Sequence, residues 1–291
     1  MKLANVDGRA VLLTADDTGL DIERATDGKF GPDVASIYEN WDGFRAWADQ
    51  APTGPETSFS RSRLGSPSPA PRQIIAIGLN YHAHAAESGF ETPDRLPPTF
   101  TKFVSALTGP DAEVVIPAGG NVDWEVELVA VIGRTATRIS EDEAWDHVAG
   151  LTIGQDISER VSQLAGPAPQ FSLGKSFPNF APVGPWLVTP DAVPDRDDLG
   201  LGCAIDGETV QDGRTRDLIF PIAALVAALS ATITLYPGDL LYTGTPAGVG
   251  VGRDPQRFLQ PGEELVSWIE GIGEMRQTFV GDPAAGSRKE A

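Results

Sequence analysis

The stretch Asp123–Gly133, DWEVELVAVIG, decides how the rest of the chain is interpreted. Its Val, Ile and Leu residues predict a β-strand inside a core. It nevertheless begins with two glutamates, Glu125 and Glu127, and residues two apart on a strand project from the same face. Two carboxylates that close disfavour each other's ionisation unless a positive charge lies between them. That face of the strand is therefore either open to water or occupied by a cation.

The composition narrows the classes of partner. The chain has 291 residues, with 22 Lys and Arg against 41 Asp and Glu, a formal net charge of −19. Such a surface repels phosphate backbones, so nucleic acids and anionic membranes are poor partners. The single cysteine, Cys203, excludes an internal disulfide and a cysteine-based zinc site. The N-terminal residues have no apolar signal segment, and no apolar run is long enough to span a membrane, so we expect a soluble, cytoplasmic protein.

A segment dense in Pro, Ser and Gly, residues 51–71, divides the chain. We expect a small, β-rich N-terminal domain with this linker over residues 1–70 and a main domain over residues 71–281. Residues 282–291 are expected to form a flexible tail.

Local signals predict more strands than helices. Asp-Gly pairs at 7–8 and 206–207 predict β-hairpins. The spacing of apolar residues predicts one helix over residues 37–48, and a capping box at 140–143 predicts a short helix ending at Gly150. Residues 221–230 predict an apolar helix with proline in its first turn. The pattern is not an alternation of strands and helices, so we expect a β-rich α+β fold.

A third carboxylate changes the interpretation of the opening strand. Asp156 follows another apolar strand, Leu151–Gly154. If the two strands are neighbours, their ends bring Glu125, Glu127 and Asp156 together. This all-oxygen set suits a hard cation, Mg²⁺ first, with Mn²⁺ or Ca²⁺ as alternatives. An edge strand with a wet face remains the competing interpretation at this point.

The segment around residues 78–87 contains a possible acid–base pair. His84 and Glu87 are three residues apart, hence on one face of a helical turn. A carboxylate that accepts one imidazole proton raises the basicity of the other ring nitrogen, which suits the activation of a water molecule. A solvated surface pair is the alternative. The other two histidines, His82 and His147, have no such partner and are expected to be structural.

Together these pieces resemble the fumarylacetoacetate hydrolase family, in its acylpyruvase and 2-hydroxyhepta-2,4-diene-1,7-dioate isomerase-like branch. The similarity extends from about Arg72 to Val280. The matching motifs, in the family's order, are GLNYxxHxxE at 78–87, FxKxxS at 100–105, DWEVEL at 123–128, DISxRxxQ at 156–163, GKSF at 174–177, PVGPW at 182–186 and GDLLYTGTPxGV at 238–249.

The resemblance implies a mixed β-sandwich roll, a homodimer and a set of site residues. It implies that Glu125, Glu127 and Asp156 bind a divalent metal, and that His84 and Glu87 form the catalytic dyad of hydrolytic members. The remaining positions matched to the family are Lys175, placed to stabilise developing negative charge, and Arg160, Gln163 and Thr245, near the substrate's acid and keto oxygens.

The implied activity is metal-dependent hydrolysis of a C–C bond in a diketo acid of the acylpyruvate or fumarylacetoacetate type, through a metal-stabilised enolate. The same site suits an oxaloacetate-type decarboxylase or a dienoate isomerase, which pass through a similar enolate. A metal-binding scaffold without turnover is a more remote alternative. Residues 88–98 are expected to belong to a mobile cover that selects the substrate tail.

Overall fold

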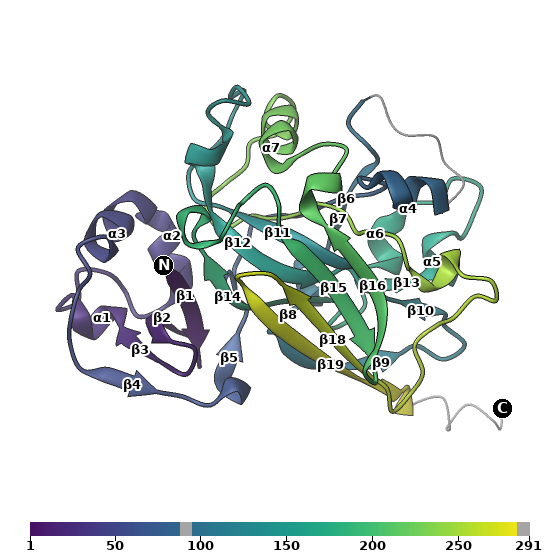
Figure 1. Cartoon of the computed structure of the whole chain (residues 1–291), viewed down its shortest axis with the longest axis horizontal. Helices are drawn as coiled ribbons and strands as arrows, with labels where there is room; N and C mark the ends of the chain where they lie inside the picture. Colours follow the sequence, from purple (N-terminus) through teal and green to yellow (C-terminus); the bar gives the residue numbers. More distant parts are fainter. Residues whose placement is uncertain (88–94, 284–291) are drawn as a thin grey trace.

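The computed structural model describes residues 1–87 and 95–283, and its main feature is a large mixed sheet (Figure 1). Ten strands follow one another across this sheet, and two short strands are attached to its side. In spatial order they are β4 (Glu56–Ser58), β3 (Thr18–Asp21), β2 (Arg9–Ala15), β1 (Lys2–Val6), β14 (Ala181–Val188), β12 (Val148–Gln155), β11 (Val126–Ile132), β17 (Leu240–Tyr242), β6 (Ile74–Ile77) and β7 (Thr99–Lys102), with β5 (Leu64–Gly65) on β1 and β8 (Leu107–Thr108) on β14.

A second sheet of five strands packs on the middle of the first. Its order is β16 (Glu208–Arg214), β15 (Gly200–Ile205), β18 (Glu264–Ile269), β19 (Gly273–Gly281) and β9 (Asp111–Ile116). Strands β15, β18 and β19 contact β11, β12 and β14 of the large sheet, and Figure 1 shows the two layers one over the other. This sandwich confirms the predicted β-rich architecture.

The central strand β11 presents different residues to the two faces of the large sheet. Leu128 and Ala130 pack in the core between the sheets, whereas Val129 and Val131 pack in a second core on the opposite face. This alternation follows from the two-residue period of a strand. Glu127 and Glu125 continue the face of Val129, so the two glutamates lie on the side away from the second sheet.

The N-terminal residues extend the large sheet and cover part of that opposite face. Helix α2 (Val34–Glu39) contributes Ile37 and Tyr38 to the second core, and helix α3 (Trp41–Ala48) contributes Trp41 and Phe44. One helix was predicted over this region; the structure has two, because Asn40 leaves helical geometry and caps both. Strand β1 pairs with β14, and the predicted linker contains β4 and β5, which pair with β3 and β1.

Of the other predictions from local sequence, the two hairpins and the capping box are confirmed, and the helix after the capping box is not. Both Asp-Gly hairpins are present, between β1 and β2 and between β15 and β16. The capping-box contacts form, because Glu143 accepts bonds from the backbone and hydroxyl of Ser140. The predicted helix after it is only a 3₁₀ turn, Ala144–His147. It ends there because Val148–Gly150 pair with β11 as the first residues of β12.

The remaining helices are short, apart from one apolar helix. They are α1 (Ile22–Ala25), α4 (His82–Glu87), α5 (Arg160–Gln163), α6 (Phe171–Gly174) and α7 (Ile222–Ser230). Among the described residues, no helix combines the length and hydropathy needed to cross a membrane. Of the predicted mobile cover, residues 88–94 lie outside the described part of the chain, as do residues 284–291 of the predicted tail.

Candidate active site

The ladder between β11 and β12 brings the three predicted carboxylates together. The two strands are antiparallel, with Glu127 opposite Gly154, so the start of β11 meets the end of β12. The backbone N–H of Asp156 donates to the carbonyl of Glu125 at 2.9 Å. One ligand oxygen from each of Glu125, Glu127 and Asp156 lies within 4.8 Å of the others, and all three side chains are buried.

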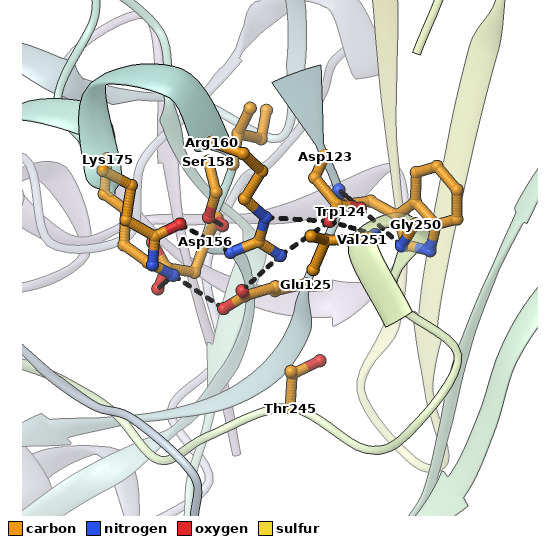
Figure 2. Close-up of polar contacts among 12 residues, drawn as sticks. Asp123, Trp124, Glu125, Asp156, Ser158, Arg160, Lys175, Thr245, Gly250 and Val251 are labelled. Carbon is orange, nitrogen blue, oxygen red and sulfur yellow. Dashed lines mark hydrogen bonds and ion pairs between the residues drawn. The ribbon is translucent and has the colours of Figure 1, made fainter. Parts of the chain in front are cut away.

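Two buried lysines contact this carboxylate cluster, and Figure 2 shows one of them, Lys175, beside Glu125 and Asp156. Nζ of Lys175 lies 2.7 Å from Oε2 of Glu125 and 2.5 Å from Oδ2 of Asp156. Nζ of Lys102 lies 2.5 Å from Oδ1 of Asp156. Because an ammonium has three N–H donors, Lys175 retains one for another acceptor.

Arg160 closes the other side of the cluster. It begins helix α5, directly after the short strand β13 (Ser158–Glu159), which pairs with β10 (Val122–Asp123). Its Nη2 lies 2.8 Å from Oε1 of Glu125, and its Nη1 donates to Oε1 of Gln163 at 2.8 Å. The structure therefore places Arg160 and Gln163 beside the carboxylates, and their contact with the substrate's oxygens stays a prediction.

The electrostatics of the two glutamates differ. Burial alone would raise the pKa of Glu125, but the charges of Lys175 and Arg160 outweigh it and hold that pKa well below its usual value. Within residues 1–87 and 95–283, no lysine or arginine is ion-paired with Glu127, and the charge of Lys175 lowers its pKa too little to offset the opposing effects. Burial, together with the charges of Asp156 and Glu125, raises the pKa of Glu127 well above its usual value.

The donor set fits a divalent cation. Glu127 is 1% exposed, and its carboxylate accepts a hydrogen bond from the backbone N–H of Gly244, at 2.7 Å. Its carboxylate faces two other carboxylates with no lysine or arginine bonded to it in the described structure. A buried carboxylate that lacks a cationic partner is costly. An all-oxygen set of this kind suits Mg²⁺ or Mn²⁺, and the residues that would hold the ion are Glu125, Glu127 and Asp156.

The glycine-rich turn after β17 forms the floor of the site beside Glu127. Gly244 has a φ of +104°, which lets its N–H point at the carboxylate, and a side chain there would collide with Asn80. Next to it, Thr245 donates its hydroxyl to the carbonyl of Val126 and accepts from Nε2 of Gln211, both at 2.8 Å. Thr245 therefore has a fixed orientation at the position predicted to meet substrate.

Helix α4 positions the predicted dyad. Nδ1 of His84 lies 3.5 Å from Oε2 of Glu87, and both side chains are mostly buried. The Glu87 carboxylate also accepts the backbone N–H of Gly248, at 3.2 and 3.1 Å to its two oxygens. His82 is exposed, and His147 lies near the carbonyl of Arg134, so neither belongs to this pair.

All nine predicted site residues except Asp156 line one cavity of about 520 Å³. Asp156 is 1% exposed and lies beneath it, bonded to Lys175. Apolar residues provide much of the remaining wall: Ile77, Leu79, Pro98, Phe100, Leu164, Phe171 and Val251. A larger hollow of about 650 Å³ contains none of the predicted site residues.

Two buried residues of the cluster were not predicted as site residues. Lys102 belongs to the FxKxxS motif, and Asp123 begins the opening stretch and forms an ion pair with Arg160. Their motif positions were a signal, but strand pairing was needed to place them. Burial lowers the pKa of the Lys102 ammonium.

Comparison with known proteins identifies the family. The model of the fumarylacetoacetate (FAA) hydrolase C-terminal domain matches residues 73–280. The chain is 47% identical over 217 residues to the 2,4-didehydro-3-deoxy-L-rhamnonate hydrolase of a Sphingomonas species, which covers 74% of this chain and 75% of the relative. It is 41% identical over 230 residues to the mitochondrial oxaloacetate tautomerase of Homo sapiens, covering 79% and 72%.

Solved structures agree with this grouping. A candidate HpcE protein of Mycobacterium smegmatis is 54% identical, with a TM-score of 0.91 over 97% of this chain and 99% of the other. A maleylpyruvate hydrolase from Sphingobium sp. SYK-6, solved with manganese(II) and pyruvate, is 31% identical, with a TM-score of 0.76 over 97% and 99%. The relatives with named activities are hydrolases, isomerases and a tautomerase.

Proposed function

This chain belongs to the fumarylacetoacetate hydrolase family, and from that premise we propose that it is a divalent-metal-dependent hydrolase that cleaves a C–C bond in a diketo acid of the acylpyruvate type. The observation that carries the proposal is that two groups of functional residues meet at one cavity. Buried carboxylates that fit a cation lie at the bottom, and the pair His84–Glu87 lines the same cavity.

The metal would be held by Glu125, Glu127 and Asp156, with Mg²⁺ or Mn²⁺ as the ion. When bound, it would supply a Lewis acid for the carboxylate and 2-oxo oxygens of the substrate. The complex of the Sphingobium relative with manganese(II) and pyruvate supports this assignment by similarity.

The protein residues supply the proton transfer. Nδ1 of His84 faces Glu87, so the carboxylate holds the tautomer in which Nε2 is free to act as a base. Nε2 would take a proton from water while the hydroxide adds to the carbonyl carbon beyond the pyruvate part. The remaining N–H of Lys175 would stabilise the oxyanion that forms. When the C–C bond breaks, its electron pair goes to the pyruvate part, which then takes up a proton.

The cavity wall supports an acyl tail on the substrate. Phe100 and Phe171 pack edge to face, with ring centroids 5.5 Å apart, and both line the cavity with Ile77 and Leu79. Arg160 and Lys175 are each already paired with two carboxylates. A short hydrocarbon tail fits such a wall because its transfer from water is favourable.

Parallel assays of acetylpyruvate and oxaloacetate test the proposal, with Mg²⁺, with Mn²⁺ and with a chelator. We expect cleavage of acetylpyruvate to pyruvate and acetate that the chelator abolishes. His84→Ala should remove this activity, and His82→Ala is the matched control because it lies exposed on the same helix. Cleavage that persists in chelator, or that survives His84→Ala, would refute the mechanism.

A second candidate is proton transfer on oxaloacetate without cleavage of a diketo acid. It is favoured by the human relative named as an oxaloacetate tautomerase, and the His84–Glu87 pair can move a proton without a water nucleophile. Decarboxylation of oxaloacetate or isomerisation of a dienoate would use the same carboxylates. Rapid keto–enol exchange of oxaloacetate, with acetylpyruvate untouched, would select this candidate. Loss of CO₂ from oxaloacetate would select the decarboxylase instead.

We further propose that residues 71–281 carry the activity in a cytoplasmic homodimer, with residues 1–70 as a small N-terminal domain and its linker. Support comes from the family model, which matches residues 73–280, and from the site, whose residues all fall in that range. Sedimentation equilibrium tests the dimer: a species of 30.8 kDa at micromolar concentration would refute it.

A further inference from the structure

Asp123 is a wholly buried carboxylate that belongs neither to the proposed metal ligands nor to the dyad. Its exposed fraction is 0%. Oδ1 accepts the backbone N–H groups of Trp124 and Gly250, at 2.8 and 2.7 Å. Oδ2 accepts the backbone N–H of Val251 at 2.9 Å and Nε of Arg160 at 2.8 Å, with Nη2 of Arg160 2.7 Å away. Five contacts from three separate chain segments therefore converge on one side chain (Figure 2).

On one side, Asp123 fixes the guanidinium that touches a proposed metal ligand. Arg160 uses Nε and Nη2 on Asp123, and Nη2 also lies 2.8 Å from Oε1 of Glu125. Its Nη1 reaches Gln163. Figure 2 shows Arg160 lying between the two carboxylates. Because a guanidinium is a rigid planar fork, holding one edge of it sets the direction of the other donors.

On the other side, Asp123 holds the loop on which the dyad rests. Gly250 and Val251 belong to the 3₁₀ turn Gly250–Gly252. Two residues before this turn, the N–H of Gly248 donates to Glu87. A side chain at Gly252 would come within 2.6 Å of the Glu87 carboxyl group, so the loop and Glu87 are in close contact. Displacement of the turn would therefore displace Glu87.

We propose that Asp123 is a positioning residue that holds the metal ligand Glu125, through Arg160, in a fixed relation to the His84–Glu87 dyad, through residues 248–252. The catalytic part of this inference rests on the proposed function. The part that concerns metal affinity does not, so the two can fail separately.

Asp123→Asn is the informative change because it keeps the size of the side chain and alters only its charge and donors. An amide has one acceptor oxygen, whereas the five contacts to Asp123 described above all come from N–H donors. On one side of residue 123, the amide –NH₂ group of asparagine would then face an N–H donor. Arg160 would also retain Glu125 as its one carboxylate partner among the described contacts, which draws Glu125 away from a metal.

Asp239→Asn provides a matched control. Asp239 is also 0% exposed and accepts two backbone N–H bonds, from Gln73 at 2.9 Å and from Tyr236 at 2.8 Å. A side-chain donor, Nε2 of Gln73, reaches it at 2.8 Å. Asp239 does not line the cavity. The two substitutions therefore remove the same kind of buried carboxylate, one at the site and one away from it.

The experiment measures Mn²⁺ affinity by calorimetry and steady-state kinetics for both variants, with unfolding midpoints as the check on stability. Positioning residues around metal ligands typically contribute about 10- to 100-fold in affinity or activity. We expect a loss of that order in Mn²⁺ affinity, and in kcat at saturating Mn²⁺, for Asp123→Asn. Asp239→Asn should change each by less than about twofold at a comparable loss of stability. If acetylpyruvate is not turned over, the Mn²⁺ affinities still decide.

A double-variant comparison tests whether Asp123 acts through Arg160. In an Arg160→Gln background, Asp123→Asn should cost much less Mn²⁺ affinity than it does alone, because residues that act as one unit are not additive. Additive losses would overturn the proposal, as would equal losses in the Asp239→Asn control or unchanged Mn²⁺ affinity in Asp123→Asn.

Amide exchange in the unaltered protein covers the case in which Asp123→Asn does not fold. The N–H groups of Gly250 and Val251 should exchange about as slowly as those of strand β11, since their acceptor is a buried carboxylate. Exchange as fast as that of exposed loops would overturn the proposal.

Discussion

Along strand β11, one face of the large sheet has two halves with opposite chemistry. The core half contains Val129 and Val131, and the site half contains Glu125 and Glu127. Val129 and Val131 belong to the same core as the aromatic residues of α2 and α3. On the same face, Glu125 contacts Lys175 and Arg160, and both Glu125 and Glu127 line a cavity. The backbone ladder runs through both halves without a break at Glu127. This difference shows that the strand fixes where the side chains lie. The segments that cover each half determine whether those side chains form part of a core or part of a site.

The largest effect is expected from removing the charge that most distinguishes the site half. Glu127→Gln should lower Mn²⁺ affinity by more than about 100-fold, beyond the range typical of residues around metal ligands, and turnover should fall with it. The metal-free protein should be at least as stable as the unaltered one, because the substitution removes a buried carboxylate that faces two others. Calorimetry and thermal unfolding in chelator measure both quantities. Metal affinity equal to that of the unaltered protein would remove the distinction between the halves.

A second substitution separates the role of the metal ligands from the role of the His84–Glu87 pair. His84→Ala should lower kcat by about 10²- to 10⁴-fold, the usual contribution of a general base. Mn²⁺ affinity should stay within about threefold, because His84 is not among the proposed ligands. Parallel kinetics and calorimetry check this. Loss of metal binding together with activity would show that His84 contributes to metal binding.

The core half should respond in the opposite way. Phe44→Ala removes a ring that is 0% exposed and packs against Phe30, Trp41 and Trp47. We expect a loss of about 3 to 5 kcal/mol in the free energy of unfolding. The kcat/KM of the folded fraction should not change, since none of these residues lines the cavity. Chemical denaturation with an active-site titration measures both. A drop in kcat/KM per folded molecule would mean that the two halves are coupled.

The sequence could predict much of the site because its residues fall at the ends of strands that are readable as strands. The two-residue spacing of Glu125 and Glu127 predicted a shared face, and the turn spacing of His84 and Glu87 predicted a pair. Asp156 required the assumption that its strand neighbours β11, which the register confirms.

What the sequence could not predict depends on contacts between distant segments. Lys102 lies on strand β7, and its ammonium reaches Asp156 only because the sheet order and the loops bring the two together. The N-terminal extension was predicted as a separate unit with a linker. Its pairing through β1 and β14 spans more than 180 residues, beyond the reach of local patterns. The 3₁₀ turn after Ser140 likewise replaced a helix because the β12 ladder competes for the same residues.

The smallest expected effect concerns an ion pair at the N-terminal end of the sheet. The hydrogen bond from Arg9 lowers the pKa of Asp21 in the folded protein. The stability it contributes is present above the unfolded pKa, near 3.8, and is lost as the pH falls through the folded value. Because Arg9 is partly exposed, Asp21→Asn should cost about 1 kcal/mol or less near pH 7. The cost should disappear once the pH has fallen through the lowered pKa of the folded protein, with turnover unchanged throughout. A cost that persists in acid would assign the effect to packing.

The central claim is that the buried carboxylates hold one divalent cation on which a 2-oxo acid binds. The most direct test is a calorimetric titration of the chelator-treated protein with Mn²⁺, followed by pyruvate with and without the ion. The account predicts one Mn²⁺ per chain and pyruvate binding that requires it. Absence of Mn²⁺ binding, or pyruvate binding of equal strength in chelator, would contradict it.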